Sequence, residues 1–353
     1  MPRMSVPHNI YIHVPFCASK CNYCAFYSAA VSPNWDKYAD DICAEIIHWG
    51  NILGHPVVPT IFLGGGTPSL MPTNIFARIM DTIHKSFHIE PGAEITIEAN
   101  PGTITSEKLD EFIAAGVNRL SVGVQSLDDE KLQFMGRRHS ACDARALLDA
   151  ATMRDIRISA DFIYGLPGDT VTSVTQMCRD INALGLTHCS MYELTIEPHT
   201  PFGKTNLDMP GDAEMADMYV AIGENLKLPR YEVSNYAAPG YECKHNANIW
   251  DGDAYIGIGR AAAGRVCMNG VWHEQMGAGA MFSPISDNTR AAEKIITGMR
   301  TRRGVKITSD VDALINWDWV RSNPNLIERT ADRLRATNLG LLTLDGILVE
   351  LIR

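Results

Sequence analysis

Short β-branched runs alternate with longer amphipathic stretches over the first 204 residues of the chain. The runs are typical of strands, and the stretches between them have the 3.6-residue period of helices. Six β-then-α units predict parallel strands joined by right-handed crossovers. Because a closed barrel needs eight units, we expect an α/β fold built on a three-quarter (β/α)6 parallel barrel. The expected strands are 9–14, 59–65, 94–99, 119–124, 158–165 and 187–194, and the expected helices are roughly 34–53, 73–87, 106–115, 128–135, 140–154 and 170–184, with Ser140 and Asp169 as N-caps.

The alternation stops near residue 205, where TNLDMPGD reads as a linker. From about residue 285 the pattern changes to amphipathic helices, a Gly turn and two strands that end the chain, which is typical of a small α+β, winged-helix-like domain. We therefore expect three regions: a barrel over 1–204, an extension over 205–284 and a small C-terminal domain over 285–353.

Composition narrows the classes of function. The 353 residues carry a formal net charge of −10, which argues against a nucleic-acid partner and against more than transient association with an anionic membrane. The N-terminal residues lack the apolar core of a signal peptide, and no apolar run approaches the length of a membrane span. The expected location is the cytoplasm.

Three of the nine cysteines form a tight cluster, CASKCNYC, directly after the first expected strand. An odd number of cysteines without an export signal does not predict a disulfide framework. Three thiolates can hold three irons of a cubane cluster and leave the fourth iron open. Zinc is the alternative, but it needs a fourth ligand, for which His13 is the nearest candidate.

The spacing of Cys17, Cys21 and Cys24 resembles the CxxxCxxC motif of the radical S-adenosylmethionine superfamily. That resemblance implies a three-quarter barrel, a 4Fe–4S cluster on these three cysteines, and S-adenosylmethionine bound to the open iron. The stretch Gly64–Pro68, GGGTP, resembles the superfamily's glycine motif, and Glu98 in EANP resembles its ribose-binding carboxylate. The implied S-adenosylmethionine contacts are Tyr11, Gly65, Gly66, Thr67, Glu98, Gln125, Arg137 and Asp161.

Longer stretches resemble the oxygen-independent coproporphyrinogen III oxidase branch of the superfamily, among them IYIHVPFC, FLGGGTPSL and SMYELTIEPHTPF. Two groups make up that branch: oxidases that decarboxylate coproporphyrinogen, and HemW-type haem chaperones that bind haem and deliver it to acceptor proteins. The oxidases carry a further cysteine where this chain has Phe26, and a longer N-terminal extension than the 16 residues before Cys17. Both differences favour the chaperone group.

A third feature is the resemblance of HNANIW, residues 245–250, to the HNxxYW motif of the chaperones. His245, Asn246 and Trp250 match, whereas Ile249 stands where tyrosine is usual. The resemblance implies His245 as an axial haem ligand, and a neutral imidazole suits that role. The alternatives are a loop histidine packed against Trp250, and ligation by Cys243. We expect a haem chaperone, with an oxidase or another tetrapyrrole-directed radical enzyme as the alternative; the acceptor protein, the catalytic residues and the oligomeric state stay open.

Overall fold

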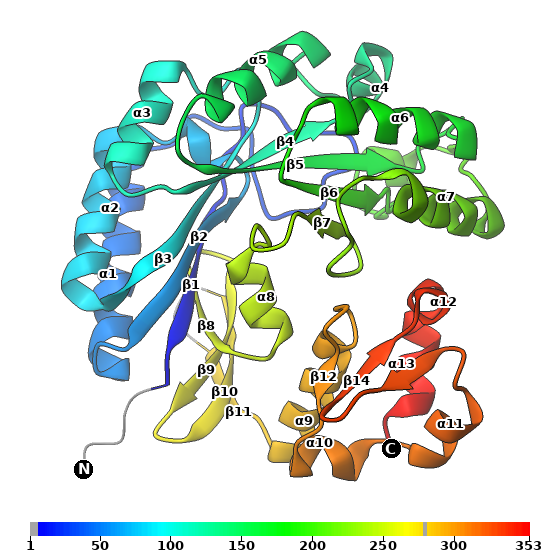
Figure 1. The fold of residues 1–353 in the computed structure, drawn as a ribbon. Coiled ribbons are helices and arrows are strands. Elements are labelled where there is room, and N and C mark those ends of the chain that lie inside the picture. Colours follow the sequence, from blue (N-terminus) through cyan, green and yellow to red (C-terminus); the bar gives the residue numbers. More distant parts are fainter. Residues whose placement is uncertain (1–5, 278–280) are drawn as a thin grey trace.

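The computed structural model describes residues 6–277 and 281–353, and it shows the six expected β/α units (Figure 1). In Figure 1 the helices α1 to α6 lie outside the curved sheet formed by β1 to β6. The elements of the barrel are β1 (His8–Val14), α1 (Trp35–Leu53), β2 (Val57–Gly65), α2 (Thr73–Ser86), β3 (His88–Ala99), α3 (Ser106–Ala114), β4 (Arg119–Gln125), α4 (Asp129–Phe134), α5 (Ala141–Thr152), β5 (Arg157–Tyr164), α6 (Val171–Ala183) and β6 (His188–Glu193).

The six barrel strands are parallel and neighbour one another in chain order. On one side β8 pairs parallel with β1 and continues into an antiparallel meander, and on the other side β7 pairs antiparallel with β6. The strand order starts at β11 and ends at β7, so the sheet of the described residues is open, as expected. The added elements are α7 (Asp212–Asn225), β7 (Asn235–Ala237), α8 (Lys244–Trp250), β8 (Ala254–Ile258), β9 (Ala263–Met268), β10 (Val271–Met276) and β11 (Met281–Pro284).

Residues 205–284 thus extend the barrel sheet at both of its edges. They share the main hydrophobic core, to which Ile222, Tyr236 and Ile256 belong. The three regions expected from the sequence stay a prediction as domains, but the second of them is structurally continuous with the first.

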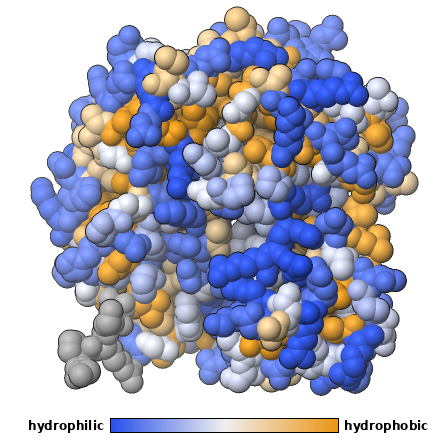
Figure 2. Space-filling model, in the orientation of Figure 1, coloured by the Kyte–Doolittle hydropathy of each residue, from blue (hydrophilic) through white to orange (hydrophobic). Residues whose placement is uncertain are grey.

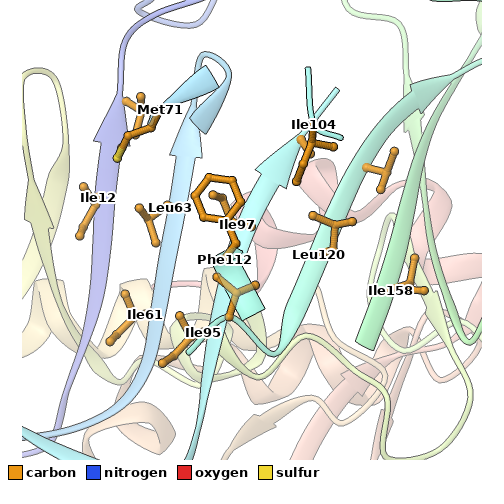
Figure 3. Packing of buried hydrophobic residues seen from close by; sticks show 14 of the residues in the cluster. Ile12, Ile61, Leu63, Met71, Ile95, Ile97, Ile104, Phe112, Leu120 and Ile158 are labelled. Atoms are coloured by element: carbon orange, nitrogen blue, oxygen red, sulfur yellow. The ribbon is translucent and has the colours of Figure 1, made fainter. Parts of the chain in front are cut away.

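Alternation along the strands separates an apolar outer face from a polar inner face. Ile12, Leu63, Ile97 and Leu120 come from four neighbouring strands and pack toward the helices, where Phe112 of α3 meets them (Figure 3). Each is completely buried, and burying a side chain of this size contributes about 1.5–3 kcal/mol. The intervening strand residues face the barrel interior, which therefore holds the polar side chains of the strands.

One expected N-cap is correct and one is wrong. Ser140 caps α5 in a capping box with Asp143. Asp169 does not cap α6; Thr170 does, by accepting a hydrogen bond from the backbone N–H of Ser173. Asp169 instead forms an ion pair with Lys131, which joins the loop before α6 to α4.

The C-terminal region has its own hydrophobic core and a three-stranded antiparallel sheet, β12-β14-β13. The expectation that two strands end the chain is wrong, because LDGILVEL forms a helix. An ion pair between Arg303 and Asp251, at 2.5 Å, joins this region to the end of α8. Its elements are α9 (Asp287–Gly298), β12 (Val305–Lys306), α10 (Ser309–Leu314), α11 (Trp317–Ser322), β13 (Ile327–Arg329), β14 (Arg333–Ala336), α12 (Asn338–Leu342) and α13 (Leu344–Leu351).

The face of the molecule drawn in Figure 2 is mostly hydrophilic, with small groups of hydrophobic residues between. Among the helices of the described residues, none combines the length and the apolar character needed to cross a bilayer.

Candidate functional site

The loop that carries the three cysteines follows β1 and is fixed by contacts that do not involve the thiols. The backbone N–H of Cys17 donates to the carbonyl of Ala29 at 3.0 Å, and that of Ala29 donates to Pro15 at 2.9 Å. Asn22 anchors the middle of the loop, because its side chain donates to the carbonyl of Phe134 at 2.8 Å and its backbone N–H donates to Met135. These backbone and amide contacts position the loop without using a thiol.

The structure brings Cys17, Cys21 and Cys24 together on the wall of one cavity of about 460 Å³. All three thiols are free and half-buried. This upper cavity, at the carboxyl ends of the strands, also contains Gly65, Gly66, Thr67, Glu98, Gln125, Arg137 and Asp161 in its lining.

His13, the proposed fourth ligand of a zinc site, is not available to a metal. Both ring nitrogens of His13 are engaged: Nδ1 contacts the Tyr11 hydroxyl at 3.0 Å, and Nε2 contacts the carbonyl oxygen of Tyr27 at 2.8 Å. The ring thus holds the loop against β1. Phe26, at the position of the oxidases' further cysteine, is 68% exposed.

The glycine stretch approaches the cysteine loop more closely than any side chain would allow. The backbone N–H of Gly66 donates to the carbonyl of Val14 at 2.8 Å, and a Cβ atom on Gly66 would lie 2.6 Å from the carbonyl oxygen of Phe16. Gly65 has a φ of 110°, which favours glycine. The backbone of β2 therefore forms part of the cavity floor beside the thiols.

Two acids lie deeper in the upper cavity. Glu98 accepts a hydrogen bond from the backbone N–H of Gly65 at 3.1 Å, and Asp161 accepts one from the Ser121 hydroxyl at 3.1 Å. Burial, and then the nearby charge of Asp161, raise the pKa of Glu98 to about 8. Burial also raises the pKa of Asp161. Glu98 therefore changes protonation close to neutral pH, where it can accept or donate hydrogen bonds to a ligand.

Arg137 links the cysteine loop to the strand ends. Its guanidinium donates to the carbonyl of Gly123 at 2.7 Å, to the side-chain oxygen of Asn100 and to the Cys21 sulfur at 3.4 Å. Gln125 has a φ of 65°, in the left-handed region, at the irregularity in β4 pairing. Arg137 thus joins Cys21 to the ends of β3 and β4.

Sequence reasoning missed several residues of this site, among them the loop anchor Asn22 and the lining residues Asn100, Ser121 and Tyr192. Asn22 lies between Cys21 and Cys24, and Asn100 is part of the motif EANP. Their positions inside recognised motifs could therefore have identified both as site residues. Ser121 and Tyr192 are polar residues at inward positions of strands that otherwise read as apolar.

A second cavity, of about 390 Å³, lies deeper in the barrel and shares Glu98, Ser121, Asp161 and Tyr192 with the upper one. The helix α8 supplies part of its lining, including His245 and Ile249. Tyr11, expected beside the other cofactor contacts, lines this lower cavity and not the upper one. His245 is therefore separated from the three cysteines by a layer of shared polar residues.

The alternative that His245 is a loop histidine packed against Trp250 is wrong. The residue lies on α8, is 3% exposed, and stacks on Phe62 with ring centroids 5.1 Å apart. Burial lowers its pKa to about 3, so the imidazole is neutral.

A chain of hydrogen bonds fixes the tautomer of His245. The Thr60 hydroxyl donates to Oδ1 of Asn9 at 2.7 Å, so it can only accept from the imidazole. His245 Nδ1, at 2.7 Å, therefore carries the proton. Nε2 is left with its lone pair and has no protein partner among the described residues, in a ring that lines the lower cavity. This is the arrangement in which metal-binding histidines are usually held.

Cys243, the alternative haem ligand, is less suited to that role. Its thiol donates to Oε1 of Glu94 at 3.6 Å, and the residue is 2% exposed. Burial is the main cause that raises its pKa to about 12. A protonated thiol is a poor ligand for iron.

Comparison with known proteins shows the family to which the chain belongs. The model of the radical SAM superfamily matches residues 11–181. A protein from Escherichia coli named "Heme chaperone HemW" is 37% identical, over 74% of this chain and 70% of its own length, and one of the same name from Haemophilus influenzae is 35% identical, over 75% and 72%. The chain belongs to the HemW family of the radical SAM superfamily. The similarity reaches the full length in a family member from Mycobacterium tuberculosis, at 30% identity over 99% of this chain and 96% of that protein.

A solved structure confirms the predicted fold. Coproporphyrinogen III oxidase (HemN) from Escherichia coli, described as a radical SAM enzyme, has a TM-score of 0.80 at 21% identity. The match covers 98% of this chain and 90% of that chain, so it includes the small C-terminal region. At this identity the likeness establishes the fold that the two proteins share.

Proposed function

We propose that the protein is a haem chaperone: it binds haem, delivers it to acceptor proteins, and carries a 4Fe–4S cluster with an exchangeable S-adenosylmethionine. The observation that carries the haem part is His245, a buried neutral imidazole whose Nδ1–H is held by Thr60 and whose Nε2 lone pair is unused. The names of its closely similar family members support the same proposal.

The residues of the upper cavity fit an iron–sulfur cluster with one open iron. Three free thiols line it, and both ring nitrogens of His13, the histidine that the zinc alternative would need, are engaged. Cys17, Cys21 and Cys24 would hold the cluster, and the close glycine backbone of β2 leaves room for a ligand on its open iron. When bound, such a cluster supplies one-electron chemistry to S-adenosylmethionine.

The lower cavity is at the small end of the range for ligand pockets. We therefore expect haem loading to widen the cavity by displacing other parts of its lining, while α8 keeps His245 against Thr60.

The nine free cysteines suit a reducing compartment, so we place the protein in the cytoplasm, with haem and a haem-acceptor protein as its partners.

An anaerobic hemin titration, paired with an assay on coproporphyrinogen III, tests the function. We expect about one hemin per chain, with the Soret band of a nitrogen-ligated haem, and no protoporphyrinogen. Phe26 provides no thiol at the position where the oxidases have one, so turnover is not expected. Formation of protoporphyrinogen would identify an oxidase instead, and a titration without a Soret shift would reject haem binding.

Replacement of Glu98 tests the S-adenosylmethionine site. If the carboxylate accepts hydrogen bonds from ribose hydroxyls, Glu98→Gln should weaken binding by about 1–3 kcal/mol above about pH 8, where the wild-type group is ionised. The sign of the pH dependence follows from the raised pKa: below about 8 the acid form predominates, so wild-type affinity should rise as pH increases through that value. Equilibrium dialysis of labelled S-adenosylmethionine measures both. Equal affinity and an equal pH slope in the variant would argue against this role.

A further inference from the structure

The lower cavity contains a buried cation that the protein does not neutralise by direct contact. Arg119, the first residue of β4, is 2% exposed and lines this cavity. Among the described residues it forms no ion pair, and its one hydrogen bond runs from Nη1 to the carbonyl of Tyr241 at 3.3 Å. Its Nε is buried without a partner.

This state of Arg119 is unusual because the group is costly to bury. A guanidinium has five N–H donors in a fork that matches a carboxylate, and a buried charge without a partner costs several kcal/mol. Glu94, on the adjoining strand β3, accepts from α8 and lies 3.8 Å from Arg157. Asp161, on β5, feels the charge of Arg119, which acts to lower its pKa, but the two groups form no ion pair and Asp161 accepts its hydrogen bond from Ser121. The orphaned donor therefore indicates a ligand group that is absent from the protein itself.

We propose that Arg119 binds a carboxylate of the molecule that occupies the lower cavity. The carboxylate and the guanidinium would form charge-assisted hydrogen bonds inside the barrel, while the ring of His245, which lines the same cavity, would contact another part of the ligand. A haem propionate is one source of this carboxylate, and that source rests on the proposed function. A free small carboxylic acid is the other source.

Arg157 provides a matched control. It is the direct cross-strand neighbour of Arg119 and carries the same charge, but it does not line the cavity and contacts Glu94 and the Tyr241 ring. If ligand affinity depended only on the positive charge of this layer, replacing Arg119 and replacing Arg157 would lower it equally. A specific loss would follow only the change at Arg119.

The experiment compares hemin with hemin dimethyl ester, which keeps the iron and the macrocycle but has no free carboxylate. Wild type and Arg157→Met should bind hemin at least about tenfold more tightly than the ester. In Arg119→Met the two affinities should become equal, while the Soret band of the histidine-ligated haem persists. Arg119→Lys, which keeps the charge but loses the fork, should give an intermediate ratio.

A second arm measures thermal unfolding with sodium propionate alone. If the carboxylate comes from a free acid, propionate should stabilise wild type and Arg157→Met but not Arg119→Met, with no discrimination between hemin and its ester. Absence of both the discrimination and the stabilisation in wild type would overturn the proposal, as would their persistence in Arg119→Met. Failure of the proposed function is separate, since it shows as a wild type that gives no hemin Soret shift.

Discussion

Replacing Cys17, Cys21 or Cys24 by alanine is expected to reduce the iron content of anaerobically reconstituted protein from about four atoms per chain to nearly none. Each thiolate would be the sole protein ligand of one iron, so the loss of any one leaves the cluster with two anchors. The broad thiolate-to-iron absorption should disappear with the iron.

The fold should survive these changes. The loop is held by the backbone pairing of Cys17 with Ala29 and by the Asn22 side chain, and neither contact uses a thiol. Far-UV circular dichroism of the three variants should therefore match wild type, which separates loss of the cluster from unfolding.

Cys142 and Cys178 provide two controls of different burial. Cys142 is exposed on α5, and Cys178 is completely buried on α6. Neither lines the upper cavity, so Cys142→Ala and Cys178→Ala should keep their iron. Loss of iron in either control, or its retention in a Cys21→Ala variant, would contradict the assignment of the cluster.

The barrel could be predicted from the sequence because its signals are local. Strands buried on their outer face read as β-branched runs, and each helix carries its own period and cap. The predicted strand at 94–99 was six residues short at its start, because β3 begins at His88 and pairs with Val57 before a register shift. An irregular pairing of this kind depends on the neighbouring strand and has no local signal.

The C-terminal error has a physical cause. LDGILVEL reads as an apolar run, which a strand and a short buried helix share. Its buried residues are Leu344, Ile347, Leu348 and Leu351, which is the helical spacing. A run of eight residues has only about two helical turns, so this spacing is a weak signal for a helix. The β-branched residues of the run therefore favoured the prediction of a strand.

The lower cavity could not be predicted because its residues come from nine strands, β1 to β9, and from α8. The sequence does contain a partial signal: Thr60, Glu94, Arg119 and His188 are polar residues at the inward positions of otherwise apolar strands. Such positions face the interior of a barrel together. The hydrogen-bond partners that decide the state of His245 and Arg119, however, are set by register and by the placement of α8.

Replacing His245 by alanine is expected to abolish nitrogen ligation of haem, which would shift and weaken the Soret band while leaving the iron–sulfur cluster intact. The cluster should be unaffected because His245 lines the lower cavity and the cysteines line the upper one.

Thr60→Val tests the orientation of the ligand more specifically, because it keeps the imidazole and removes the hydroxyl that accepts from Nδ1–H. Losing such an orienting partner typically costs 10–100-fold in metal affinity, and we expect a loss of that order for hemin. Cys243→Ala should bind hemin as wild type does, because its thiol is protonated and bonded to Glu94. An unchanged Soret band in His245→Ala, together with its loss in Cys243→Ala, would transfer the role of axial ligand from the imidazole to the thiol.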